Sequence, residues 1–307
     1  MRSIISLSAN LRINSWLTVQ ARGSVDYISD KMRQKFYAST APALCGANGR
    51  YIEMDYQETL IYGDVMAMGK RKWEDFALDV AIGGSINDKN VNSTRYDSKN
   101  ASLKYANVFN LANIVMNGSA SIDQKIDSRR QLQSVFGTAQ VGYQDKVFLD
   151  LTARNDWAST LAYTSHEKSG FFYPSAGLSF LIDKWIQLPE WISFAKLRGT
   201  YSKVGNDIPQ FITNSVSHIT AGGELQANDA APFKEMEPEM THSVEVGTEW
   251  RFFQSRLGFN LTYYRTNTHN QFFKLPALAG DMYAYRYVNA GDIQNRGWEL
   301  TVDATPV

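Results

Sequence analysis

The chain has 307 residues, and its 31 basic and 31 acidic residues give a formal net charge of 0 at pH 7. This balance argues against a nucleic-acid partner, because proteins that bind nucleic acids carry a basic surface. No stretch approaches the ~18 consecutive apolar residues of a transmembrane helix, and the single Cys45 excludes an internal disulfide and a cysteine-rich metal site.

Hydrophobic alternation with a period of two predicts β-strands along most of the chain. The first clear strand runs from Trp16 to Tyr27, and a loop is expected over 28–50. Further strands are predicted at 51–67, 76–84 and 113–126, with an exposed polar loop over 87–107. The most regular pattern follows, where residues 133–143 and 147–156 flank the short polar turn Gln144-Asp145-Lys146. Two alternating strands around such a turn predict a β-hairpin.

The second half of the chain repeats this pattern. Strands are predicted at 172–182, 194–203, 243–252, 257–264 and 297–304. The segment between Val204 and Met240 has no clear period, and a loop of this length is uncommon unless it has a function. The chain as a whole predicts an all-β fold of about 11 strands without a helix.

Two architectures fit strands that are polar on one face. Asp150, Arg154 and Asp156 share one face of the strand 147–156, which suits the outer face of a soluble sandwich or the lumen of a membrane barrel. Most strands run ~10 residues, the length of a tilted membrane strand. Short and long connections alternate, and aromatic residues cluster near strand ends, as in membrane barrels. These features favour a transmembrane antiparallel β-barrel over the sandwich.

Five stretches resemble motifs of the SusC/RagA family of TonB-dependent outer-membrane transporters, and they occur in the family's order. They are Arg154-Asn155-Asp156 with Ser159, then Tyr173–Phe180, then Lys196–Ser202 with Val204-Gly205-Asn206, then Pro238-Glu239 with Thr241, Ser243, Glu245 and Gly247, and finally Asn289, Gly291, Ile293, Asn295, Gly297 and Glu299. The chain departs from the motifs at Trp157-Ala158, where Gly-Ser is usual, and at Met236–Glu239, which lacks the usual Asn-Pro-x-Leu.

The resemblance implies a TonB-dependent receptor barrel of about 22 strands, located in the outer membrane of a Gram-negative cell. Residues 1–307 are then expected to be a barrel fragment, with the plug domain and the final strands outside it. The family imports oligosaccharides, the commoner assignment, or peptides. Its expected partners are a SusD-like lipoprotein lid, TonB through the N-terminal part, and outer-membrane lipid. The resemblance implies neither a cofactor nor an enzyme.

The alternatives are a passive porin or structural barrel, an outer-membrane enzyme using Ser165 and His166, and a soluble β-protein.

Candidate binding residues fall into two groups, each with a plainer explanation. The polar face carries Arg154, Asp156, Arg198, Glu245 and Glu299, which either bind substrate or simply solvate the lumen. The loop aromatics Trp157 and Tyr163 either stack on sugar rings or pack within the loops. The four histidines are far apart in the sequence, so neither a metal site nor a catalytic site is predicted.

Overall fold

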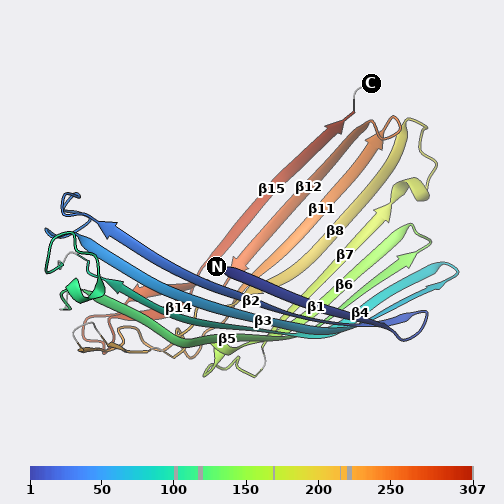
Figure 1. Ribbon diagram of the computed structural model, residues 1–307. Helices are drawn as coiled ribbons and strands as arrows, with labels where there is room; N and C mark the ends of the chain where they lie inside the picture. Colours follow the sequence, from blue (N-terminus) through green and yellow to red (C-terminus); the bar gives the residue numbers. More distant parts are fainter. Residues whose placement is uncertain (100–102, 117–119, 169, 215, 220–222, 306–307) are drawn as a thin grey trace.

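A computed structural model describes residues 1–99, 103–116, 120–168, 170–214, 216–219 and 223–305. These residues form one 11-stranded antiparallel sheet in which each strand pairs with the next large strand of the chain (Figure 1). Its strands are β1 (Arg2–Arg12), β2 (Leu17–Phe36), β3 (Arg50–Trp73), β4 (Phe76–Asp97), β5 (Ser121–Tyr143), β6 (Val147–Ala158), β7 (Phe171–Leu181), β8 (Ile192–Asn206), β11 (Glu239–Phe252), β12 (Leu257–His269) and β15 (Asp292–Ala304).

Small elements occupy the connections. Strands β9 (His218–Ile219) and β10 (Leu225–Gln226) form one short hairpin, and β13 (Phe272–Pro276) and β14 (Tyr285–Asn289) form another. Three short 3-10 turns are described: η1 (Leu111–Asn113), η2 (Ser159–Leu161) and η3 (Ile182–Lys184). The sheet curves into an open trough with short turns along one end and long connections at the other (Figure 1). This alternation of short and long connections is typical of membrane barrels.

In the described part of the chain, no helix has the length and hydropathy needed to span a bilayer.

The strand register separates the side chains into two faces. One row across five strands joins Val80, Ala139, Leu151, Ala176 and Tyr201 as successive cross-strand partners. We call this apolar side the outer face, and the opposite side, with Gln140 and Asp150, the inner face. Leu151 is 42% exposed, so the apolar row has no protein cover. A continuous exposed apolar band on a curved sheet fits contact with lipid.

Aromatic rings lie along the short-turn end of the sheet. Phe76 and Tyr143 are 5.0 Å apart between ring centroids, Phe180 stacks on Trp185 at 5.3 Å, and Trp191 stacks on Phe252 at 5.6 Å. Such a row matches the aromatic girdle at a membrane–water interface. The aromatic clusters expected at strand ends are therefore present at this end.

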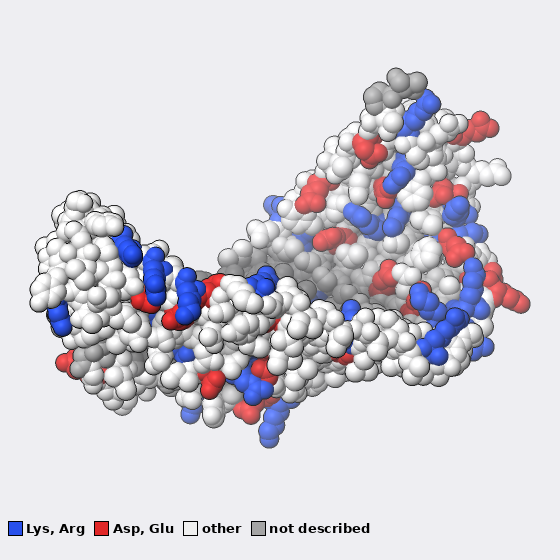
Figure 2. All heavy atoms as spheres, viewed as in Figure 1, with Lys and Arg blue, Asp and Glu red and all other residues white. Residues whose placement is uncertain are grey.

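Strands β2 to β5 continue beyond the apolar band, and we call this part the extension. Here the outer face becomes charged: Lys31 pairs with Asp55 directly across the β2–β3 ladder at 3.4 Å, and Arg33 pairs with Glu53 at 3.2 Å. Figure 2 shows basic side chains in a row beside acidic ones over this end of β2 and β3. Opposite charges directly across a ladder stabilise a sheet that is exposed to water.

The extension corrects the predicted boundaries in several places. Residues 87–97 belong to β4 instead of a loop, and 28–36 belong to β2. The strand predicted over 113–126 is replaced by η1 and by β5, which begins at Ser121, while 117–119 lie outside the described residues. Strand β1 was not predicted. The predictions over 28–36 and 87–97 failed because these strand ends are held by cross-strand polar pairs, so the apolar half of the alternation is weak there. Strand β1 does alternate, with Ile5, Leu7 and Leu11 on the outer face.

A buried carboxylate fixes the far end of the extension. The side chain of Asp97 is 2% exposed and accepts hydrogen bonds from Arg50 Nε at 2.8 Å and Arg95 Nη2 at 2.7 Å, together with the Lys99 N–H at 2.8 Å. Burial alone would raise the pKa of Asp97, but the hydrogen bonds from Arg50 and Lys99 and the two guanidinium charges outweigh it and lower the pKa to about 2.

Asp97→Asn is expected to destabilise the extension by on the order of 2 kcal/mol. The lowered pKa means that the folded extension favours the charged form of Asp97 by about this amount, and asparagine cannot carry the charge. Since the folded-state pKa lies below the unfolded one, this stabilisation is fully present above about pH 4 and is lost as the pH falls toward about 2. Hydrogen exchange of residues 50–56 in the full-length protein measures it. Asp55→Asn, at an exposed pair, should cost under about 1 kcal/mol. Equal effects of the two variants would refute this role for Asp97.

A pair of neighbouring residues tests the assignment of the faces. Leu151→Arg places a charge on the outer face and should destabilise the folded barrel by roughly 2–4 kcal/mol, whereas Thr152→Arg points to the inner face and should be tolerated. The measurement is the heat-dependent gel shift of the full-length protein in outer-membrane fractions. If both variants keep the shift equally, the two faces have been assigned wrongly.

Candidate functional site

The long connections fold over the inner face and share a hydrophobic core. We call the described residues of 159–170, 207–238 and 270–291 the loop cluster. The core joins the loop cluster to the adjacent ends of β6 and β7, and its buried residues are Ala158, Leu161, Phe171, Ile208, Ile212 and Met236. Leu132 and Tyr173 of the sheet pack against it. The connection without a period therefore has a defined structure, because its apolar residues pack against the barrel wall.

Asp207 ties the longest connection to the sheet. Its carboxylate accepts hydrogen bonds from Arg130 Nε at 2.8 Å and from the Thr160 hydroxyl, and it caps the Ile208 N–H at 2.7 Å. Thr213 adds a hydrogen bond from its hydroxyl to the Thr160 carbonyl at 3.3 Å. Charged partners make these hydrogen bonds stronger than neutral ones. Asp207 thus joins β5, η2 and the 207–238 connection.

Asn289 forms a second anchor. Its amide nitrogen donates to the Glu237 carbonyl at 2.8 Å and to the Asn270 carbonyl at 2.7 Å, and its oxygen accepts from the Glu237 N–H at 2.8 Å. Asn289 belongs to the last of the five sequence motifs, and the structure shows that its side chain joins two loops.

Arg154 and Asp156 come together on the inner face, as the alternation predicts. Arg154 Nε donates to Asp156 Oδ1 at 2.7 Å, and Arg154 Nη2 donates to Ser134 Oγ at 2.7 Å. Asp156 is 8% exposed and lies beside the loop core. Their mutual pairing and burial suit a role in supporting the loop cluster.

Arg198 reaches across a whole strand. It lies opposite Gly247 of β11, and its Nη2 donates to Thr262 Oγ1 of β12 at 2.8 Å. A Cβ at position 247 would lie 2.8 Å from Arg198 Nε, so glycine opens the path for the guanidinium. The glycine was visible in the sequence as part of a motif, but its relation to Arg198 depends on the register.

The remaining predicted site residues are spread out. Glu245 and Glu299 are exposed, on β11 and β15. Their strand positions place them on the inner face. Trp157 lies on the opposite face from Asp156, and its Nε1 donates to the Lys168 carbonyl at 3.0 Å. Glu249, at another inner-face position of β11, pairs with Arg251 at 2.9 Å. These residues do not converge on one pocket with Arg154.

Two aromatic side chains project from the loop cluster. Tyr163 is 68% exposed and Phe211 is 53% exposed, although the nearby residues Leu161 and Ile212 are buried in the core. Their φ angles are 69° and 67°, in the left-handed region that bulky residues rarely adopt. Backbone strain of this kind costs on the order of 1–3 kcal/mol per residue and is concentrated at functional sites.

Two histidines that are far apart in the sequence lie side by side in the structure. His242 and His269 are 27 residues apart in sequence, yet neighbouring strands bring their ring centroids to 5.6 Å. His242 Nδ1 also meets the Tyr201 hydroxyl at 2.9 Å. Among the described residues, no group of three or more histidine, cysteine or acidic side chains is arranged to hold a metal ion. Their register positions on β11 and β12 place both histidines on the outer face.

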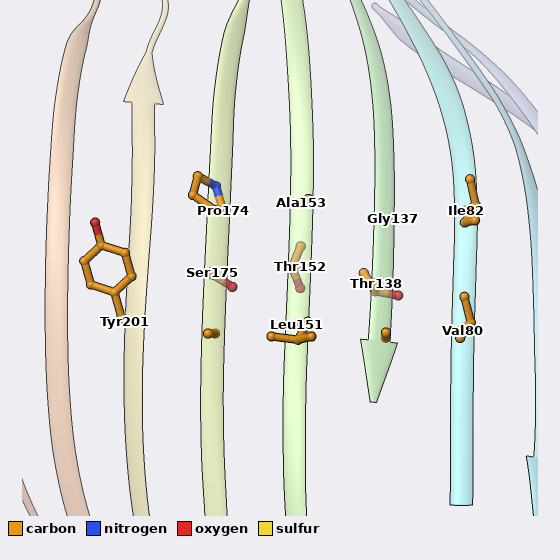
Figure 3. Close-up of a pocket in the computed structure, with 12 residues that line it drawn as sticks. Val80, Ile82, Gly137, Thr138, Leu151, Thr152, Ala153, Pro174, Ser175 and Tyr201 are labelled. Atoms are coloured by element: carbon orange, nitrogen blue, oxygen red, sulfur yellow. The ribbon is translucent and has the colours of Figure 1, made fainter. Parts of the chain in front are cut away.

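A shallow groove crosses the outer face between β4 and β8. Its lining includes small residues of the central strands, Gly137, Ala153 and Pro174, between Ile82 on one side and Tyr201 on the other (Figure 3). The groove lies on the lipid-facing side, so it is not part of a passage through the lumen.

Comparison with known proteins decides the family. The family model described as "TonB dependent receptor-like, beta-barrel" matches residues 3–305. The chain belongs to this family. A TonB-dependent receptor barrel lies in the outer membrane, so the apolar outer face is the lipid-facing surface and the inner face lines the lumen.

Solved structures support the same fold. The RagAB peptide transporter superposes on this receptor barrel with a TM-score of 0.79 at 20% identity, covering 100% of this chain and 35% of that chain. The ferripyoverdine receptor of the outer membrane of Pseudomonas aeruginosa gives 0.59 at 16% identity, covering 100% and 38%. The resemblance noted in the sequence is therefore confirmed at the level of fold.

Curated relatives extend the match to sequence. TonB-dependent receptor P26 of Formosa agariphila is 27% identical over 187 residues, which cover 58% of this chain and 18% of that protein. TonB-dependent receptor P3 of the same organism is 24% identical over 183 residues, covering 57% and 18%. The receptor barrel described here thus spans about a third of the solved structures and matches about a fifth of the curated relatives.

Asp207→Asn should loosen the loop cluster without unfolding the barrel. The variant weakens the hydrogen bonds from Arg130 and Thr160, so opening of residues 207–214 is expected to become about tenfold more frequent. Hydrogen exchange of the full-length receptor measures this opening. The matched control is Asp229→Asn, whose exposed carboxylate lies 3.5 Å from Lys274. Unchanged exchange in D207N would contradict the anchoring role.

Proposed function

We propose that this barrel is part of a TonB-dependent transporter that imports oligosaccharides or peptides across the outer membrane. The match of the family model to residues 3–305 carries this proposal. The barrel wall would supply the passage, and TonB would supply energy through a plug domain in the parent protein. On this proposal residues 1–307 are one barrel segment, and a SusD-like lipoprotein would cover the extracellular mouth.

The polar inner face suits the passage of a hydrophilic solute. Asp150, Glu245 and Glu299 lie on this face, whereas the outer face is apolar. A lumen of this kind hydrates a passing solute and meets the plug with charged groups. Arg154, Asp156 and Arg198 are satisfied by protein partners, and we assign them to wall and loop support in this proposal.

The exposed aromatics are the best candidates for substrate contact. Tyr163 and Phe211 flank the shared loop core, since Leu161 and Ile212 beside them are both buried in it. Rigid aromatic rings provide contact area at low entropic cost, and they suit both the apolar faces of sugar rings and the side chains of peptides. The strain at both residues supports a functional reason for their conformation.

The decisive measurement is energy-dependent uptake by cells that express the full-length parent protein. Labelled oligosaccharides and labelled peptides are supplied with and without a protonophore. Import coupled to TonB should stop when the protonophore removes the proton gradient. Uptake that continues at the same rate would favour a passive porin and overturn the proposal. The label that accumulates identifies the substrate class.

The double variant Tyr163→Ala with Phe211→Ala should lower uptake by about tenfold, because each aromatic contact contributes roughly 0.5–1.5 kcal/mol. Tyr105→Ala is the control, since Tyr105 is 71% exposed on a different connection. Full uptake by the double variant would remove both aromatics from the binding surface. Outer-membrane levels of each variant are compared so that lost protein is not mistaken for lost transport.

A further inference from the structure

A row of small hydroxyl side chains crosses the inner face of the sheet at one height. Its members are successive cross-strand partners on the neighbouring strands β5, β6, β7, β8, β11 and β12. We call this row the hydroxyl belt, and it consists of Thr138, Thr152, Ser175, Ser202, Ser243 and Thr266. Figure 3 shows its first three residues at one height on β5, β6 and β7. Five strand spacings separate the ends of the belt, so it is roughly 24 Å long.

The hydroxyls of the belt have no hydrogen-bond partner among the residues that the structure describes. Directly opposed threonine and serine side chains commonly stabilise a sheet by bonding to each other. Thr241 and Thr268, an opposed pair on the same inner face, do so at 2.8 Å. Thr262 accepts a hydrogen bond from Arg198 at 2.8 Å. The belt differs from these neighbours, because its donors and acceptors are available to a molecule in the lumen.

The belt lies on the part of the wall that carries the loop cluster. Five of its six strands are joined by connections of that cluster, which link β6 to β7, β8 to β11 and β12 to β15. Toward the other strands, the run of hydroxyls ends at Ala81 of β4 and Met68 of β3, which occupy the next positions of the same row. A molecule that moves from the exposed rings of Tyr163 and Phe211 toward the short-turn end therefore meets the belt.

The belt is uncharged, whereas the inner-face rows on both sides of it carry charges. The row nearer the short turns includes Asp150 and Glu245, and the row nearer the long connections includes Arg154. Charged groups form strong hydrogen bonds, whereas a neutral hydroxyl forms a weaker bond that water readily replaces. Conduction through a pore requires many weak contacts, so that a solute that has entered can also leave. Six neutral hydroxyls in a row meet this requirement.

We propose that the hydroxyl belt contacts the solute during its passage through the lumen. The solute that it fits is rich in hydrogen-bonding groups and uncharged where it touches the wall, a chemistry that sugar hydroxyls and peptide backbones share. Each contact replaces a hydrogen bond to water by one to the wall. This inference rests on the proposed import function, and it adds the strands along which the solute moves.

The test compares two pairs of opposed serines in the full-length parent protein. Ser175→Ala with Ser202→Ala removes two hydroxyls of the belt. The matched control is Ser6→Ala with Ser24→Ala, an opposed pair on the inner face of β1 and β2, outside the belt. Uptake of a labelled oligosaccharide and of a labelled peptide is measured in cells that express each variant. Outer-membrane levels and the heat-dependent gel shift show that each variant is present and folded.

The belt variant should take up the label that the parent accumulates about fivefold more slowly, because each lost hydrogen bond to the wall raises the barrier to passage. The half-saturating concentration should change by less than about twofold, since the exposed aromatics are intact. The control variant should match the parent in both quantities. Thr138→Val with Thr152→Val removes two more hydroxyls with little change of shape, and it should slow uptake to a similar extent.

Uptake at the parental rate in both belt variants, or an equal loss in the control, would overturn the proposal. Unchanged uptake with faster entry of a large antibiotic that the parent excludes would overturn it too, because the belt would then contact the plug domain. Uptake by the parent that resists the protonophore would refute TonB coupling, yet the comparison of the variants would still decide the role of the belt. A parent that takes up neither label would contradict both the proposed function and this inference.

Discussion

The fold depends on one constraint, which is that a backbone in lipid has no water to bond its N–H and C=O groups. The sheet meets this constraint with a ladder that continues from β1 to β15 in antiparallel pairs. Each strand between β1 and β15 forms backbone hydrogen bonds with both neighbouring strands. Its side chains can therefore point only to the lumen or to the lipid. The period-two pattern, the apolar band and the polar inner face all follow from this ladder.

Because the lipid restricts the outer face, chemical variety is concentrated on the inner face and in the long connections. Those connections leave the ladder, so they need another way to satisfy their polar groups and to gain stability. They use a small apolar core around Leu161 and Met236 and two side chains, Asp207 and Asn289, that bond several loops at once. Exposed aromatics can then be presented from a rigid base.

The sequence was enough to predict features that depend on residues close together in the chain. The hairpin around Gln144-Asp145-Lys146 appears at the predicted place, because alternation and turn chemistry are local. The extension was missed because Lys31 and Asp55 are 24 residues apart and stabilise the strands only as a pair. Arg198 with Gly247, His242 with His269, and the role of Asn289 in joining loops also depend on register or on loop packing, and a single sequence contains no direct signal of either.

The pairing of charged side chains on the outer face also indicates where the membrane ends. On the extension, each outward arginine or lysine named above has a carboxylate partner, which fits a surface in water where pairing limits self-repulsion. At the edge of the apolar band, Arg265 instead meets the neutral amides of Asn267 and Gln294. The charged pairs therefore belong to the part of the outer face that lies in water, and the boundary with the lipid lies at the end of the apolar band.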